Sequence, residues 1–184
     1  MSERSTGPTL VLGLGNPIMG DDGFGLAVLE RLLADWALPA GVEAVDGGTW
    51  GMKLLPQIEQ SDRLLLLDAV NAGLVPGTPV ILERAELPRY FALKLSPHQI
   101  DLREVLALAE LRGTLPRDLV AIGAQPERLE LATELSAPLA ARVGEIAALA
   151  AARLERWGHR CRRIAGAVPG LKRTPFLHRK DPSA

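Results

Sequence analysis

Acidic residues and one histidine follow predicted strands of this 184-residue chain, and their types could support metal or acid–base chemistry. Asp21 and Asp22 lie shortly after the first apolar run, and Asp68 directly follows four leucines at 64–67. A carboxylate in that position is partly removed from water, which costs free energy unless it is paired or binds a metal. His98, the only histidine before residue 159, follows Pro97 in a predicted loop.

Two carboxylates and an imidazole form an oxygen and nitrogen ligand set that suits a divalent first-row metal. Ligands of open α/β sheets gather at the carboxyl ends of the strands, so we predict that Asp22, Asp68 and His98 meet at one edge. Simpler roles stay open for each residue taken alone. Asp21 and Asp22 could serve simply to begin a helix, where carboxylates interact favourably with the helix dipole. Asp68 could accept backbone N–H bonds, and His98 could be a packing residue.

Common nucleotide-binding and nucleophile motifs do not fit this chain. Ile18 stands where a dinucleotide-binding loop that begins at Gly13 and Gly15 needs a further glycine, and no Gly-Lys-Ser/Thr sequence follows. The chain also lacks a Gly-x-Ser-x-Gly elbow and a His-Glu-x-x-His motif. Cys161 is the only cysteine, which excludes an internal disulfide and a four-cysteine zinc site.

Strand and helix patterns alternate along the sequence. Apolar runs predict strands, and residues spaced three or four apart predict helices. Asp101 and Glu104 form a predicted capping box, and Ser136 is the predicted cap of a final helix that Gly158 ends. This order predicts an α/β fold of three layers with a mostly parallel sheet. The predicted strands are 9–14, 42–45, 63–67, 78–82 and 119–122, and the other predicted helices are 23–36 and 51–60.

Composition and charge narrow the class of protein. With 47% hydrophobic residues, no membrane-length apolar run and no basic, apolar leader, the chain is expected to be a cytoplasmic globular protein. Residues 1–157 carry 14 lysines and arginines against 21 acidic residues, whereas residues 158–184 carry seven against one. We therefore predict one domain over 1–158 and a basic, poorly ordered tail over 159–184. The acidic body argues against nucleic-acid binding.

Five short motifs resemble those of one known family. Gly-Leu-Gly-Asn at 13–16, Asp-Asp-Gly-Phe-Gly at 21–25, Asp-Gly-Gly-Thr at 46–49, Asp-Ala-Val at 68–70 and Ser-Pro-His-Gln at 96–99 occur in the order of the hydrogenase maturation proteases. These endopeptidases trim the C-terminus of the large subunit of nickel–iron hydrogenase. The resemblance covers roughly 10–157 and is closest to members that serve uptake-type hydrogenases.

The resemblance implies a twisted five-stranded sheet flanked by helices and a monomer that acts on the large-subunit precursor. It also implies a nickel-dependent step, with nickel supplied by the substrate's own centre, and a grouping with aspartic-type endopeptidases. The family's metal-contacting and catalytic positions fall on Asp22, Asp68 and His98, although the family often has glutamate in place of Asp22. The positions near the cleft that are expected to orient the substrate are Asn16, Asp46 and Thr49.

Two other functions fit part of the sequence. A nickel chaperone without protease activity would use the same ligands, but it would be expected to have more cysteine and histidine. A peptidyl-tRNA hydrolase would share Gly-Leu-Gly-Asn-Pro at 13–17, but it would need a histidine soon after this segment and a basic body.

Overall fold

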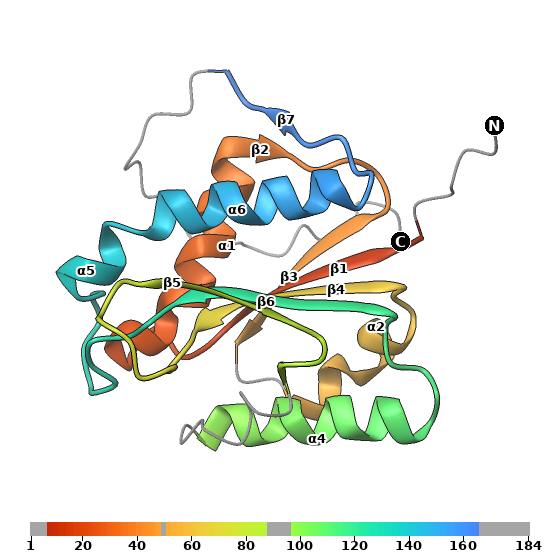
Figure 1. Ribbon diagram of the computed structural model, residues 1–184, viewed down its shortest axis with the longest axis horizontal. Helices are drawn as coiled ribbons and strands as arrows, with labels where there is room; N and C mark the ends of the chain where they lie inside the picture. Colours follow the sequence, from red (N-terminus) through yellow and green to blue (C-terminus); the bar gives the residue numbers. More distant parts are fainter. Residues whose placement is uncertain (1–6, 49–50, 88–96, 166–184) are drawn as a thin grey trace, which may run out of the picture.

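A computed structural model describes residues 7–48, 51–87 and 97–165, with only the backbone described for 97–101. Its centre is a five-stranded sheet in the order β3-β1-β4-β6-β5 (Figure 1). Four strands are parallel, and β5 runs antiparallel to β6 at one edge. The predicted mostly parallel sheet is confirmed. The strands are β1 (Thr9–Leu14), β3 (Val42–Gly48), β4 (Arg63–Ala69), β5 (Pro79–Glu83) and β6 (Asp118–Ala124).

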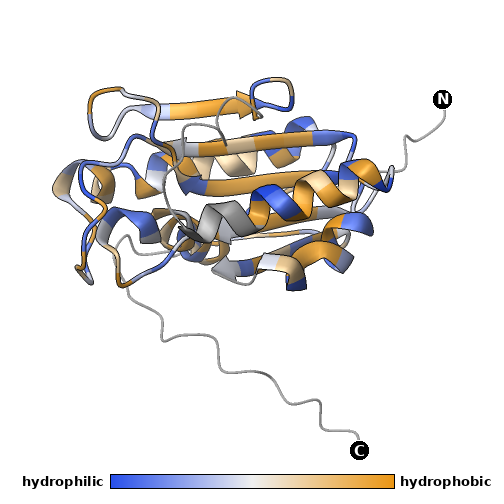
Figure 2. Ribbon diagram, turned by 90° about the horizontal axis from the view of Figure 1, so that it is seen from below, coloured by the Kyte–Doolittle hydropathy of each residue, from blue (hydrophilic) through white to orange (hydrophobic). Residues whose placement is uncertain are grey.

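Helices cover both faces of the sheet (Figure 1). One face packs on α1 (Phe24–Asp35) and α6 (Val143–Arg156), and the other packs on α2 (Leu55–Glu59) and α4 (Pro97–Leu111). The three central strands, β1, β4 and β6, are mostly apolar and almost fully buried, and the sheet is largely orange in Figure 2, because the centre of a parallel sheet is covered on both sides. Leu64 and Leu66 of β4 face α4, while Leu65 and Leu67 face α1 and α6. This alternation places Asp68 on the α4 face.

The first turn of α4 corrects two predictions. The helix begins at Pro97, so Pro97 and His98 lie in its first turn and not in a loop. Asp101 is therefore inside the helix and is not its N-cap. Proline suits a first turn, because its fixed φ is already helical and its missing N–H has no partner to lose there. The capping-box pattern identified the right helix but placed its first residue at 102, five residues too late.

The predicted final helix is divided in two. A short helix, α5 (Ala137–Ala140), precedes α6, and Ser136 makes no side-chain cap to α5. The Ser136 hydroxyl instead donates to the carboxylate of Asp21 at 2.9 Å. This partner is 115 residues away in the sequence, which is why a local pattern suggested a cap. Gly158, with φ of 94°, follows the end of α6 as predicted.

The described part of the predicted tail is packed on the domain. Strand β7 (Arg162–Arg163) pairs antiparallel with β2 (Trp36–Ala37), which follows α1. His159 is buried, and its Nε2 lies 2.7 Å from the hydroxyl of Thr9 in β1. The folded unit therefore extends beyond the predicted boundary at 158, whereas 166–184 lie outside the described residues. Within the described ranges, no helix is long and apolar enough to cross a membrane.

Candidate functional site

Glycines allow the segment after β1 to lie directly against the ends of the strands. This segment includes the short 3-10 helix η1 (Gly20–Gly23). Gly15 has φ of +113°, and a Cβ there would overlap the carbonyl oxygen of Asp22. A Cβ on Gly25, at the start of α1, would overlap the carbonyl oxygen of Leu67 in β4. Both contacts are with backbone atoms, so the carboxyl ends of β1 and β4 hold η1 and Asp22 in place.

Asp22 is buried, with 3% of its surface exposed, although it lies in a connecting segment. Its Oδ2 accepts a hydrogen bond of 2.9 Å from the backbone N–H of Asn16. The Asn16 side chain accepts a bond of 3.2 Å from the N–H of Ile18. Asn16 therefore shapes its own loop and fixes the orientation of the Asp22 carboxylate.

Asp68 ends the apolar part of β4 and is also 3% exposed. Its register partner in β6 is Gly123, where a Cβ would overlap the Asp68 carbonyl oxygen. The side chain lies on the sheet face that α4 covers, and α4 carries His98 in its first turn. The His98 side chain lies outside the described residues. At the level of the backbone, the predicted trio lies at one edge of the sheet, and the roles of the three residues remain predictions.

A narrow hollow adjoins these residues at the ends of β1 and β3. Its walls include Leu14, Gly15, Gly47 and Gly48 from the strands and their ends, and Leu102 from α4. The helix η2 (Gly51–Leu54) closes one side with Leu54. Gly51 also lines the hollow, so four of its lining residues are glycines and backbone atoms form much of the wall, which an extended peptide could approach closely.

Asp46 lies away from this hollow. It is exposed, pairs in register with Gly13, and shares the α1 face of β3 with Ala44. Burial and the charge of Asp46 together raise the pKa of Glu30 in α1, which also places Asp46 near that helix. The structure therefore does not bring Asp46 to the face on which Asp68 lies, and Thr49 lies outside the described residues.

Asp21 has a structural function that the sequence did not reveal. It is fully buried, and its carboxylate accepts N–H bonds from Glu127, Arg128 and Ser136 at 2.7–3.0 Å, besides the Ser136 hydroxyl. Burial alone would raise the pKa of Asp21, but these hydrogen bonds outweigh it and leave the pKa below its ordinary value. Asp21 therefore joins the loop after β1 to residues 127–136 after β6.

Gln125 fixes a third loop at the same edge. It is buried directly after β6, and its Oε1 accepts the N–H groups of Ala72 and Leu74 at 2.8 and 3.1 Å. Its Nε2 donates to Asn71 and to the carbonyl of Pro126. These bonds hold the loop that follows Asp68. A polar residue directly after an apolar strand is the same signal that singled out Asp68, and it could have identified Gln125.

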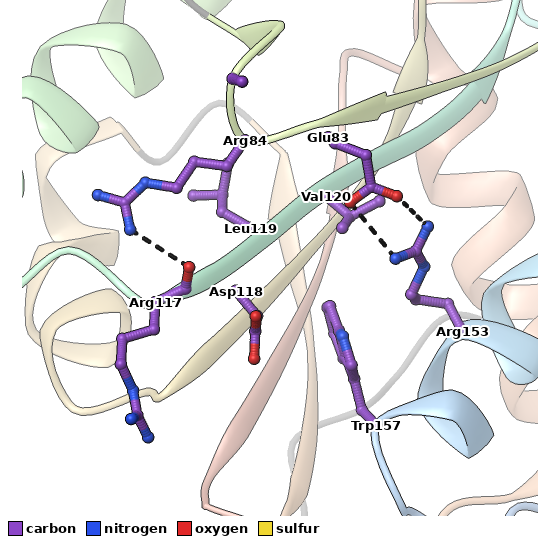
Figure 3. A pocket seen from close by; sticks show the side chains of 9 residues that line it. Glu83, Arg84, Arg117, Asp118, Leu119, Val120, Arg153 and Trp157 are labelled. Atoms are coloured by element: carbon purple, nitrogen blue, oxygen red, sulfur yellow. Dashed lines mark hydrogen bonds and ion pairs between the residues drawn. The ribbon is translucent and has the colours of Figure 1, made fainter.

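A larger cavity of about 210 Å³ lies elsewhere, near the start of β6 (Figure 3). Arg153 of α6 binds Glu83 of β5 there at 2.5 Å, and Arg84 donates to the carbonyl of Arg117 at 3.2 Å. Figure 3 shows both contacts across the cavity. The first contact joins the edge strand β5 to α6, and the second joins the end of β5 to the residue before β6, both at the end of the sheet opposite Asp22 and Asp68. Among the described residues, no group of three His, Cys, Asp or Glu side chains is arranged to hold a metal.

The fold and the site together define a three-layer α/β protein with buried carboxylates at the carboxyl edge of its parallel strands. The sequence model of one family, described as hydrogenase maturation protease, matches residues 26–153. HupD of Rhodobacter capsulatus is 40% identical over 81% of this chain and 72% of its own length. The chain belongs to the hydrogenase maturation protease family, which confirms the family predicted from the motifs.

Other relatives agree with this assignment. HoxM of Azotobacter vinelandii is 45% identical over 66% of this chain, and the match spans 59% of that protein. The hydrogenase 2 maturation protease of Escherichia coli is 42% identical over 66% of this chain and 74% of its own length. The solved structure of the E. coli hydrogenase maturating endopeptidase HybD superposes with a TM-score of 0.81 at 35% identity, covering 85% of this chain and 97% of that one.

Proposed function

We propose that this protein is an endopeptidase that removes the C-terminal extension of the large-subunit precursor of a nickel–iron hydrogenase after nickel insertion. It acts as a monomer in the cytoplasm. Family membership supports the reaction and its substrate. The observation that carries the site is the pair of buried carboxylates, Asp22 and Asp68, at neighbouring strand ends beside the first turn of α4.

Nickel arrives in this proposal as part of the substrate. Cysteine thiolates of the precursor hold it, and Asp22, Asp68 and His98 complete its coordination. Recognition then depends on nickel, because a precursor without the metal offers nothing for the carboxylates to bind. The two carboxylates stay in place without the metal, since strand β4 and the Asn16 N–H position them.

Hydrolysis needs a base for water and a proton for the leaving amine. A carboxylate of the site accepts a proton from water as the water oxygen adds to the scissile carbonyl carbon. The proton then passes to the amide nitrogen as the C–N bond breaks. Nickel held by the substrate is the alternative activator, acting as a Lewis acid on the carbonyl. The aspartic-type grouping corresponds to the first route.

The test is to mix the protein with purified precursor, either loaded with nickel or free of it, and to follow the electrophoretic mobility of the precursor. We expect only the loaded precursor to become shorter. Asp68→Asn should slow this processing by roughly 10²-fold or more, the usual loss on removing a general base. Asp118→Asn is the matched control, because Asp118 begins the adjacent strand at the opposite edge. A loaded precursor that stays intact with the unaltered protein contradicts the proposal.

The two alternatives gain no support from the comparisons. The nickel chaperone predicts nickel binding without cleavage, and the same mobility assay separates it from the protease. The peptidyl-tRNA hydrolase is not represented by the matching family or by the relatives named above.

A further inference from the structure

Three exposed apolar side chains lie on two joined loops at the same edge as Asp22 and Asp68, where Leu74 and Val75 are also exposed on the loop after β4. Ile18, from the loop after β1, is 53% exposed, and Leu129 and Leu131, from the loop after β6, are 46% and 80% exposed. We call these three residues the apolar rim. None of them belongs to either of the two cores that hold the fold together. The fold therefore does not need their apolar character.

The two loops that carry the apolar rim are joined by backbone hydrogen bonds. The N–H of Ala132 donates to the carbonyl of Ile18 at 3.1 Å, and the N–H of Gly20 donates to the carbonyl of Ala132 at 2.7 Å. These bonds place the backbone of Ala132, the residue that follows Leu131, beside the backbone of Ile18 and Gly20. Asp21 holds both ends of the second loop through Arg128 and Ser136. The apolar rim is thus presented by a fixed backbone, as preorganised binding surfaces are.

Charge around the apolar rim is mainly negative. Glu127, Glu130 and Glu134 are exposed on the same loop, and Arg128 is the only basic residue between 126 and 136. Arg128 lies 3.8 Å from Glu130 and is partly neutralised by it. A partner surface that fits would be apolar at its centre and basic around it.

We propose that the apolar rim docks the folded body of the hydrogenase large-subunit precursor, through an apolar patch bordered by basic side chains. This inference rests on the proposed function. The rim is continuous with the site, because Ile18 and Asp22 belong to one short segment. The C-terminal extension must reach Asp22 and Asp68 to be cleaved. The apolar rim has no group able to act on a peptide bond, so it is available to contact the rest of the substrate. Exposed apolar patches commonly mark such contacts.

The test compares Leu131→Asp with Leu111→Asp in the processing of nickel-loaded precursor. Leu111 is a matched control, because it is 85% exposed and ends α4 at the opposite edge of the sheet. We expect Leu131→Asp to lower kcat/KM by roughly ten- to hundredfold, almost entirely through KM, as for a central docking residue. Leu111→Asp should match the unaltered protein. Leu129→Asp is a second rim variant, and unchanged thermal unfolding of each variant shows that the fold is intact.

A binding experiment separates the body of the substrate from its extension. The unaltered protein should bind a large subunit that lacks the extension almost as tightly as it binds the precursor. Leu131→Asp should weaken that binding at least tenfold. Wild-type processing by Leu131→Asp, an equal loss in Leu111→Asp, or a loss confined to kcat would each overturn the inference. A protein that self-associates through Leu131 would also overturn it, in favour of a second copy. Failure of the unaltered protein to process the precursor would instead count against the proposed function.

Discussion

Asp21 and Asp22 are adjacent in sequence and almost equally buried, but their carboxylates have different partners. Asp21 uses both oxygens to hold the loop after β6. Asp22 accepts a hydrogen bond from the N–H of Asn16 in its own loop. A carboxylate surrounded by backbone donors is committed to structure, whereas Asp22 keeps capacity to bind something else. We therefore expect Asp21 to contribute to stability and Asp22 to precursor processing.

Substitution by asparagine should reveal this difference. Asp21→Asn replaces an acceptor by an amide N–H₂ that faces other donors, so we expect the free energy of unfolding to fall by about 2–3 kcal/mol. Asp22→Asn keeps an oxygen for the Asn16 N–H and should cost less than about 1 kcal/mol, yet it should abolish precursor processing. Urea unfolding and the mobility assay measure the two effects. Equal loss of stability in both variants would contradict the separation.

The packing of α1 against the strand ends is the corresponding feature at the scale of elements. A Cβ on Gly25 would overlap the carbonyl oxygens of Leu67 and Leu14, and neither backbone can move without disturbing the sheet. We expect Gly25→Ala to shift the start of α1 together with Asp22, to lower the unfolding free energy by roughly 2 kcal/mol or more, and to reduce processing.

Gly144→Ala is the matched control for this substitution. Gly144 lies at the same second position of α6, and a Cβ there would meet only Arg31, at an ordinary 3.9 Å. Alanine in a helix should stabilise the protein by about 0.5–1 kcal/mol, because it restricts the unfolded chain. Chemical denaturation of both variants gives the comparison. A Gly25→Ala protein as stable as Gly144→Ala would show that the close approach does not hold α1.

The same elements show which features a sequence can predict. Strand β4 and the position of Asp68 in it were predictable because the run of leucines and the polar residue that follows it are adjacent in the chain. The start of α4 was misplaced because a proline that begins a helix and a proline in a loop look alike locally. The role of Ser136 was missed because its partner, Asp21, is brought near only by the completed fold. Local patterns thus predicted the trio, while the supports that hold its loops are long-range contacts.

The whole molecule divides its functions between the two edges of the sheet. The carboxyl edge carries the candidate site and the apolar rim, whereas the amino edge holds the segment after α6 against β1. His159 is a buried titratable group of this second edge. Burial and the positive charge of Arg63 lower its pKa below the ordinary 6.5. The folded protein therefore resists protonation of His159 more than the unfolded chain does.

Stability should consequently depend on pH in the direction that this shift sets. Above pH 6.5 both states hold neutral His159, and its titration contributes nothing. As the pH falls through 6.5, the unfolded chain takes up a proton before the folded one does, so the free energy of unfolding decreases until the lower, folded pKa is passed.

His159→Gln removes the titrating group and should flatten the curve between pH 7.5 and about pH 5. Urea unfolding at several pH values measures the difference between the two proteins, which cancels the titration of the other groups. We expect the curve of the unaltered protein to be steeper than that of the variant only below neutral pH. Two parallel curves would show that the charge state of His159 does not contribute to holding the 159–165 segment. Processing at pH 7.5 should be the same in both proteins, because Thr9 and His159 lie at the edge opposite Asp22 and Asp68.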